Sequence, residues 1–404
     1  MEILLLIVGL VLFVALVVVH EFGHFIMARR NGVDVEEFGI GFPPRAMTLG
    51  KDTKGTKYTL NWLPLGGFVR LKGEHDSDKE KGSFGAASFW AKTKIVLAGV
   101  FMNLLTAWVM FSFLALVGIP RLPLPDGSEQ FTVASDTKII SNKILIGYVE
   151  KDGPADKAGI RTSDEILVIS ARDVFEDEAK CTGVENDNPF LRCSTGAEPN
   201  VYAKDVRSTT EGVLKNDHIK VHIELLRKGV KQSIVVAPRS LDEVAASEKT
   251  DNPKGYLGIQ PYDYTVQRST WSAPIVGAGL IRQYSGLTYK ALGSSVASLF
   301  KGHGKEAGEN VSGPIGIFVV LKDGASLGAP YILLIIGLLS LTLAIMNTLP
   351  IPALDGGKLA VMLIFRAFKK PLTPKLEERI HGSGFMLLML LFVLITFVDI
   401  KRFF

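Results

Sequence analysis

Two histidines near the N-terminus, His20 and His24, flank the glutamate Glu21 in the order His-Glu-x-x-His. On a helix, side chains four residues apart share one face, so the two imidazoles can bind one zinc ion. The glutamate between them can take a proton from a water molecule that the metal activates. These residues follow the apolar run 3–19, and ionisable side chains at membrane depth are costly unless they act together. The alternative is that the membrane span ends before His20 and the three side chains face water.

A catalytic zinc ion usually takes three protein ligands, so a third must come from elsewhere in the chain. Asn347, Pro350, Pro352 and Asp355 follow one another at the end of a later apolar segment. The prolines break a helix and free backbone groups that need partners inside the protein. Asp355 then lies at about the membrane depth of the histidines and is the candidate third ligand. Alternatively it caps a short helix over residues 356–368, which leaves the Asn and the prolines unexplained.

Four apolar segments are expected to span a membrane: residues 3–27, 95–119, 331–349 and about 384–400, the last being the shortest. The chain has 404 residues, of which 47% are hydrophobic and 21% charged. This composition suits a membrane protein with a soluble insert. The net charge of +4, with no basic stripe, argues against nucleic-acid binding. Two cysteines exclude a disulfide-dense scaffold.

The positive charges near the span ends predict the orientation in the membrane. The loops after the first and third spans carry clustered Lys and Arg residues, whereas no Lys or Arg precedes the first span. These two loops are therefore expected in the cytoplasm, and both termini and the large insert outside. Lys401 and Arg402 argue mildly for the opposite orientation.

The insert is similar to a PDZ domain over residues 143–260. Predicted strands at 143–149, 165–169, 220–226 and 232–237, a short helix within 153–160 and a closing strand at 256–259 follow that order. Ser163-Asp164 replaces the usual Gly-Asp, and residues 176–200 form an unusual polar insertion. Such a domain would bind a peptide tail by strand addition or act as a size filter, but a purely structural role is the alternative.

Two cysteines, Cys181 and Cys193, lie in this polar insertion on the predicted outer side. An oxidising compartment would let them pair and close a loop worth about 3 kcal/mol. Counting free thiols by alkylation and intact mass under non-reducing conditions tests this prediction.

The combination of His-Glu-x-x-His in the first span with Asn-x-x-Pro-x-Pro-x-x-Asp-Gly in the third resembles the site-2 protease family of intramembrane zinc metalloproteases. The best match is the bacterial regulator-of-sigma-E protease type, which has a single PDZ domain. Val100 stands where the family's Ala-Gly-Pro-x-x-Asn stretch has proline. Further matching stretches are residues 37–42, 62–70, 72–74, 98–103 and 312–316.

The resemblance implies a polytopic α-helical membrane protein with about four transmembrane helices, a membrane-associated β segment and an extracytoplasmic PDZ-like α+β domain. The expected division is residues 1–119 for the first two spans and the β segment, 130–265 for the PDZ-like domain, and 331–404 for the last two spans. Residues 266–330, above all 271–300, would be an amphipathic segment at the outer membrane surface or a linker. The protein would be a multi-pass protein of the cytoplasmic (inner) membrane.

The implied activity is endoproteolysis of transmembrane segments in single-span membrane proteins, a form of regulated intramembrane proteolysis with anti-sigma factors or remnant signal peptides as examples. One Zn²⁺ would be bound per chain. The implied roles are metal ligand for His20, His24 and Asp355, general base for Glu21, and substrate binding for Asn347, Pro350 and Pro352.

Residues 58–71 are the expected edge strand that holds a substrate extended, with an ordinary cytoplasmic hairpin as the alternative. A catalytically silent scaffold that binds partners through the PDZ-like domain is the main alternative function, although it has no need of Glu21. A metal transporter would need more polar residues across the spans.

Overall fold

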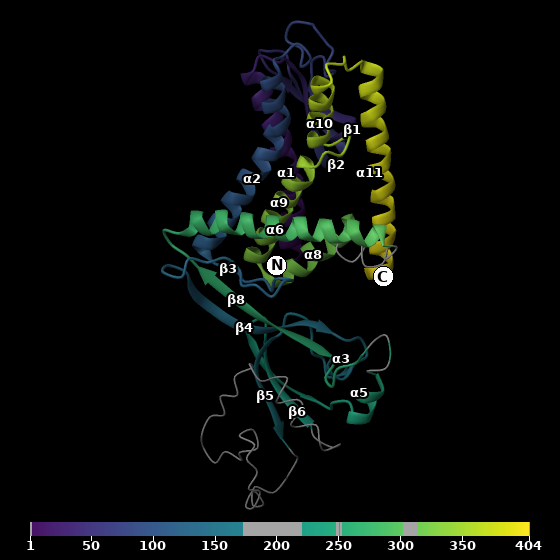
Figure 1. The fold of residues 1–404 in the computed structure, drawn as a ribbon. Helices are drawn as coiled ribbons and strands as arrows, with labels where there is room; N and C mark the ends of the chain where they lie inside the picture. Colours follow the sequence, from purple (N-terminus) through teal and green to yellow (C-terminus); the bar gives the residue numbers. More distant parts are fainter. Residues whose placement is uncertain (1, 173–219, 248–249, 251–252, 302–312, 404) are drawn as a thin grey trace, which may run out of the picture. The chain divides into compact units, whose positions relative to one another are not determined.

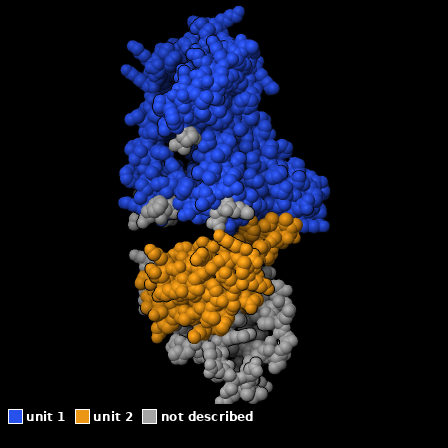
Figure 2. Space-filling view, turned by 180° about the vertical axis from the view of Figure 1, so that it is seen from behind, with its two compact units in different colours: residues 1–138, 267–404 blue, residues 139–266 orange. Residues whose placement is uncertain are grey.

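The computed structural model describes residues 2–172, 220–247, 250, 253–301 and 313–403. The chain forms two compact units, residues 1–138 with 267–404 and residues 139–266 (Figure 2). The predicted insertion 176–200 lies outside the described residues, together with Cys181 and Cys193. The disulfide therefore stays a prediction.

Four helices of the first unit are long and apolar enough to cross a membrane, which confirms the predicted spans. Outward-facing apolar side chains such as Leu4, Val11, Phe385 and Met386 are exposed, as expected of a lipid-facing surface. The four helices are α1 (Glu2–Arg30), α2 (Phe89–Val117), α9 (Ala329–Thr348) and α11 (Pro374–Phe403).

The prediction that the fourth span is the shortest is wrong. Helix α11 begins at Pro374 and has 30 residues. Its first turns are polar, and a search for apolar runs misses them. These turns pack against protein: Glu377 is buried, and its Oε2 accepts the backbone N–H of Asp76 at 3.0 Å.

The linker interpretation of residues 271–300 is also wrong, because they form the helix α6 (Ala273–Phe300). In Figure 1, α6 runs across the spanning helices. It buries Val276 and Leu280 in a cluster with Phe111 of α2 and Leu334 of α9. Its location at a membrane surface stays a prediction.

A further helix, α8 (Pro314–Leu327), lies in the segment predicted as linker or amphipathic. Leu321 of α8 packs with Leu16 of α1 and Ile332 of α9. The helix therefore belongs to the helical unit and is no flexible connection.

Two long, bent strands, β1 (Val35–Lys51) and β2 (Lys57–Leu71), follow α1. Phe38 pairs with both Tyr58 and Val69, and Gly39 with both Thr59 and Phe68. Residues 37–40 thus lie between two stretches of β2. Residues 67–71 pair with residues 35–40 of β1, so they form an outer strand of a curled sheet.

The remaining helix of this unit, α10 (Asp355–Ala367), follows α9 after a short turn. Figure 1 shows α10 with β1 and β2 at one end of the unit, and both chain termini at the other. The two-residue strand β3 (Ile119–Pro120) directly follows α2.

The second unit is an α+β fold whose strands lie in the order β8-β4-β5-β6-β7. Its apolar core includes Ile146, Ile160, Ile223 and Leu225. The elements in chain order are β4 (Lys138–Val149), α3 (Pro154–Lys157), β5 (Glu165–Arg172), β6 (Lys220–Arg227), β7 (Val230–Val236), α5 (Leu241–Ser247) and β8 (Ile259–Arg268).

Two details of this unit bear on the predicted pattern. The closing strand begins at Ile259, later than predicted, because Gly258 has φ +69° and makes a turn before it. Ser163 has φ +68°, a conformation that favours glycine. The following Asp164 is buried and accepts two hydrogen bonds from the Arg227 guanidinium.

Candidate metal centre

The two histidines of α1 lie one helical turn apart with their Nε2 atoms 3.2 Å from each other. Helix α1 continues past them to Arg30, and His20 is only 8% exposed. The alternative that these side chains simply face water is therefore wrong. Two imidazole nitrogens this close in a buried site repel unless a proton or a cation lies between them.

The carboxylate of Asp355 completes this cluster. Its Oδ2 lies 3.1 Å from His20 Nε2 and 3.3 Å from His24 Nε2. In a tetrahedral zinc site with bonds of about 2.0–2.1 Å, neighbouring ligand atoms are about 3.3 Å apart. The three edges of the observed triangle fit that geometry. In the described part of the chain, this is the one group of three or more His, Cys, Asp or Glu side chains that could hold a metal ion.

Two glycines let α10 begin close to the turn that follows α9. A Cβ at Gly356 would lie 2.3 Å from the Thr348 carbonyl oxygen, and one at Gly357 would lie 1.9 Å from that of Ile351. Larger residues at either position would push α10 and Asp355 away. Leu354 is the N-cap of α10 and makes no side-chain cap, and Asp355 points its carboxylate at the histidines. The capping alternative is thus not the arrangement observed.

Helix α2 supplies partners for the second nitrogen of each imidazole. His24 Nδ1 lies 2.7 Å from the Ile95 carbonyl oxygen, which can only accept, so the proton is on Nδ1 and Nε2 has a free lone pair. His20 Nδ1 lies 3.2 Å from the amide nitrogen Nδ2 of Asn103, and the buried Oδ1 of the same amide has no hydrogen-bond partner among the described residues. When Nε2 coordinates a metal, Nδ1 carries the proton, and the amide oxygen must then face it.

Asn103 and Gly99, which lies one turn earlier on α2, both belong to the family-like stretch 98–103, but the sequence predicted no role for either. A Cβ at Gly99 would lie 2.5 Å from His24 Nε2 and 2.6 Å from His20 Nε2. The missing side chain is what allows α2 to pack directly on the ligand atoms. A small residue four positions before a buried polar one in a spanning helix was the available signal.

Glu21 points to a different neighbour, the outer strand of the curled sheet. A Cβ at Gly67 would lie 3.4 Å from Glu21 Cγ, and the Val69 backbone is within hydrogen-bonding reach of the carboxylate. The carboxylate is also close enough to His20, His24 and Asp355 to interact with their charges. It thus lies near both the ligand cluster and strand 67–71.

The curled sheet is held by a buried carboxylate of its own, Glu37. Thr59 Oγ1 donates to its Oε1 at 2.8 Å, and Arg45 donates to the same atom at 2.9 Å. Burial alone would raise the pKa of Glu37, but these hydrogen bonds and the nearby guanidinium groups of Arg45 and Arg70 lower it below its usual value. Glu37 therefore stays ionised and fixes the sheet at neutral pH.

The predicted substrate-binding residues lie around the same turn but are not drawn into the ligand cluster. Asn347 is half-buried in the last turn of α9, and no hydrogen bond of its side chain is seen among the described residues. Pro350 is exposed. Pro352 packs its carbonyl against Gly384 of α11.

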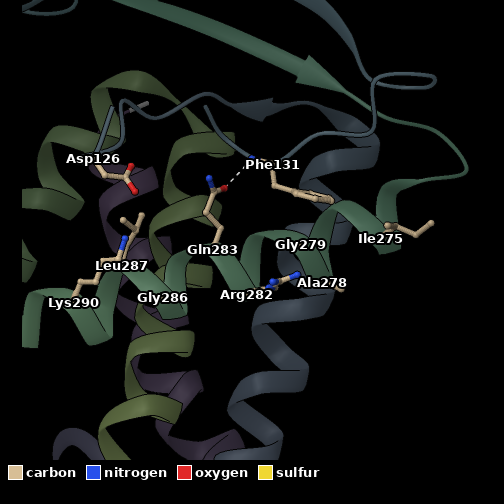
Figure 3. A pocket seen from close by; sticks show the side chains of 10 residues that line it. All are labelled: Asp126, Phe131, Ile275, Ala278, Gly279, Arg282, Gln283, Gly286, Leu287 and Lys290. Atoms are coloured by element: carbon tan, nitrogen blue, oxygen red, sulfur yellow. Dashed lines mark hydrogen bonds between the residues drawn. The ribbon is translucent and has the colours of Figure 1, made fainter. Parts of the chain in front are cut away.

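A separate shallow groove of about 590 Å³ runs along α6 (Figure 3). It is partly closed by the segment before the second unit, where the Phe131 N–H donates to Gln283 Oε1 at 2.8 Å. No histidine or cysteine lines it, and none of the residues of the ligand cluster does. It therefore offers no second metal centre.

Comparison with known proteins gives a match over nearly the whole chain. The model of the family described as "Peptidase family M50" matches residues 8–391 of this chain. A protein of Clostridium perfringens is 30% identical over 98% of both chains. The regulator of sigma-E protease RseP of Escherichia coli is 26% identical over 96% of both chains. The zinc metalloprotease RasP of Geobacillus kaustophilus is 26% identical over 98% of this chain and 97% of its own.

Proposed function

The chain belongs to peptidase family M50, and from that premise we propose that it cuts the transmembrane segments of single-span membrane proteins. Membership makes it a site-2 type intramembrane zinc metalloprotease, a multi-pass inner-membrane protein acting on membrane-protein substrates. The observation that carries the proposal is the convergence of His20 and His24 of α1 with Asp355 of α10 at distances of 3.1–3.3 Å.

In the proposed site, one zinc ion is held by His20 Nε2, His24 Nε2 and Asp355 Oδ2. Zinc bound there supplies positive charge, which favours the ionisation of water and polarises a peptide carbonyl. The chain prepares the ligands: the Ile95 carbonyl holds the proton on His24 Nδ1, and the Asn103 side-chain amide lies against His20 Nδ1. The amide oxygen of Asn103 would hold the proton on His20 Nδ1 once the amide is turned to face it.

Glu21 is the proposed general base. It is not part of the ligand triangle, yet it lies beside it and against strand 67–71. Its carboxylate takes a proton from the attacking water and returns it to the nitrogen of the departing amine. A base must lie within reach of both the water and the substrate, and a side chain near both the cluster and the strand meets that requirement.

The same strand offers a way to hold the substrate. A helical peptide bond is shielded by its own hydrogen bonds, so a substrate must be extended before it is cut. Among the described residues, 67–71 pair with β1 alone, and a peptide can add to their other edge as a further strand, where the Leu71 N–H now donates to Glu74 Oε1. Gly67 has no side chain between that edge and Glu21, so an added strand would pass close to the base.

The turn after α9 is the second proposed substrate contact. The Asn347 amide can donate to a peptide carbonyl and accept from a peptide N–H. Pro350 and Pro352 keep the chain from continuing α9 beyond Thr348. The three residues are thus proposed to bind the unwound stretch of the substrate.

We also propose that both termini and residues 139–266 lie outside the cytoplasm. The unit is inserted between α2 and α6, so it emerges on the side where α2 ends. The clustered cations of residues 28–94 and 369–379 favour the cytoplasm for the opposite side. A PDZ-like role for the inserted unit, as a peptide binder or a size filter, is part of this proposal and is supported by its order of strands and short helix.

A comparison of membrane-protein fragments between cells with wild-type protein and cells with Glu21→Gln tests the substrate class. We expect fragments that end inside single-span segments and disappear in the variant. Anti-sigma factors and remnant signal peptides are the examples to look for first, because one relative is named for sigma-E regulation. If every fragment that depends on Glu21 ends in a soluble domain, the proposed substrate class is wrong.

A further inference from the structure

The candidate third ligand follows a turn with an unusual backbone. Ala353 has φ +81°, a left-handed conformation that residues with a Cβ rarely adopt. It lies two residues before Asp355, in the segment that joins α9 to α10. Such a conformation persists only where surrounding contacts fix it. Within the turn, Leu354 N–H donates to the Ile351 carbonyl at 3.1 Å, but Ala353 N–H finds its partner elsewhere.

That partner is His381 on α11, whose Nδ1 accepts the Ala353 N–H at 3.2 Å. The other ring nitrogen, Nε2, is buried and has no hydrogen-bond partner in the described structure. Burying an unpartnered nitrogen is unfavourable, and an aliphatic side chain would avoid it. The Nδ1 bond to the turn is therefore what an imidazole contributes at this position.

The next residue on the same face of α11, Gly384, meets the same turn. It is buried, and a Cβ there would lie 2.2 Å from the Pro352 carbonyl oxygen. Gly382, two residues earlier, has nothing within 4 Å of the same position. Helix α11 thus contacts the turn in two ways. His381 Nδ1 accepts a hydrogen bond from the turn, and the absence of a side chain at Gly384 makes room for the backbone of the turn.

We propose that His381 and Gly384 are positioning residues for the metal site. They hold the turn before Asp355, so that its Oδ2 stays within 3.1–3.3 Å of both histidine Nε2 atoms. Neither residue belongs to the ligand cluster, and both act through the backbone of the turn. The inference rests on the proposed role of Asp355 as a ligand, and it gives the last span a function in the chemistry.

Two matched pairs of variants of the full-length protein test this inference: His381→Leu against His381→Asn, and Gly384→Ala against Gly382→Ala. The Asn side-chain oxygen is as many bonds from the backbone as His Nδ1, so it can still accept. Zinc affinity is measured by competition with a chelator, and kcat and KM by cleavage of a single-span substrate. We expect His381→Leu and Gly384→Ala to weaken zinc binding about tenfold or more and to lower kcat at nearly unchanged KM. His381→Asn and Gly382→Ala should stay close to wild type.

Asp355→Ala is the reference that separates this inference from the proposed ligand set. If Asp355→Ala loses zinc while His381→Leu and Gly384→Ala bind it like wild type, the positioning role is overturned and the ligand set stands. If Asp355→Ala keeps its zinc, the ligand set itself fails. Equal losses of zinc affinity and kcat in the two variants of either matched pair would also overturn the inference. Should His381→Leu not fold, Gly384→Ala against Gly382→Ala decides.

Discussion

At the scale of single residues, the ligand cluster depends on which nitrogen of each imidazole carries the proton. Each Nδ1 has a partner on α2, and each Nε2 faces Asp355. An imidazole without a partner for Nδ1 would rotate or take the other tautomer, and its Nε2 would no longer be a ligand. The partners on α2 thus decide whether the two histidines can act as a pair.

The pair Asn103→Leu and Asn103→Asp tests this dependence. Leucine removes the acceptor for His20 Nδ1–H, so zinc affinity should fall by about 10–100-fold. Aspartate keeps an acceptor oxygen at the same place and should retain most of the affinity. Chelator competition on the purified proteins gives both values. Equal affinities for Asn103→Leu and wild type would show that Asn103 does not orient His20.

The four residues with the clearest chemistry could be predicted from sequence, because each is marked by residues close to it along the chain. His20, Glu21 and His24 lie within one helical turn, and Asp355 follows two helix-breaking prolines. The residues whose roles were missed act across helices. Ile95 and Asn103 meet α1 through α2, and no spacing along the chain reports such contacts.

At the scale of elements, the curled sheet brings an open strand edge to the general base. A hairpin was one of the predicted alternatives for residues 58–71, but the double pairing of residues 37–40 with both parts of β2 was not predicted. It requires register shifts at several positions, and alternation of apolar and polar residues does not reveal them.

Two glycines of this sheet form a matched pair for testing the free edge. A Cβ at Gly67 would lie 3.0 Å from the Gly39 carbonyl oxygen and 3.4 Å from Glu21 Cγ, whereas Gly50 has nothing within 4 Å. We expect Gly67→Ala to lower kcat/KM about tenfold or more with zinc content unchanged, because it displaces the base and crowds the strand edge. Gly50→Ala should cleave like wild type. Peptidase assays with metal analysis of both variants provide the check, and normal cleavage by Gly67→Ala would rule out an approach of substrate at this point.

The helical elements show where apolar patterns mislead. The core of each span is apolar and was predicted, but the polar first turns of α11 and the helix α8 were not, and α6 was predicted only as an amphipathic segment or a linker. Their polar residues find partners in the protein, as Glu377 does with the Asp76 backbone. Hydropathy alone cannot distinguish a polar turn packed on protein from one in a loop.

At the scale of the whole molecule, the proposed orientation can be tested in cells. In a background with Cys181→Ser and Cys193→Ser, we introduce Lys231→Cys in the second unit or Lys370→Cys in the loop before α11. Both lysines are exposed. An impermeant thiol reagent should label the first variant in intact cells and the second only after permeabilisation. The reverse pattern would invert the orientation.

The central claim is that spans α1 and α9–α10 meet to form one zinc site in which Glu21 is the base and not a ligand. Metal analysis and cleavage assays on purified Glu21→Gln and Asp355→Ala test it most directly. We predict that Glu21→Gln keeps about one zinc per chain and cleaves nothing, whereas Asp355→Ala loses both zinc and cleavage. An Asp355→Ala protein with full zinc content and full proteolysis would contradict the account, because the third ligand would then lie elsewhere.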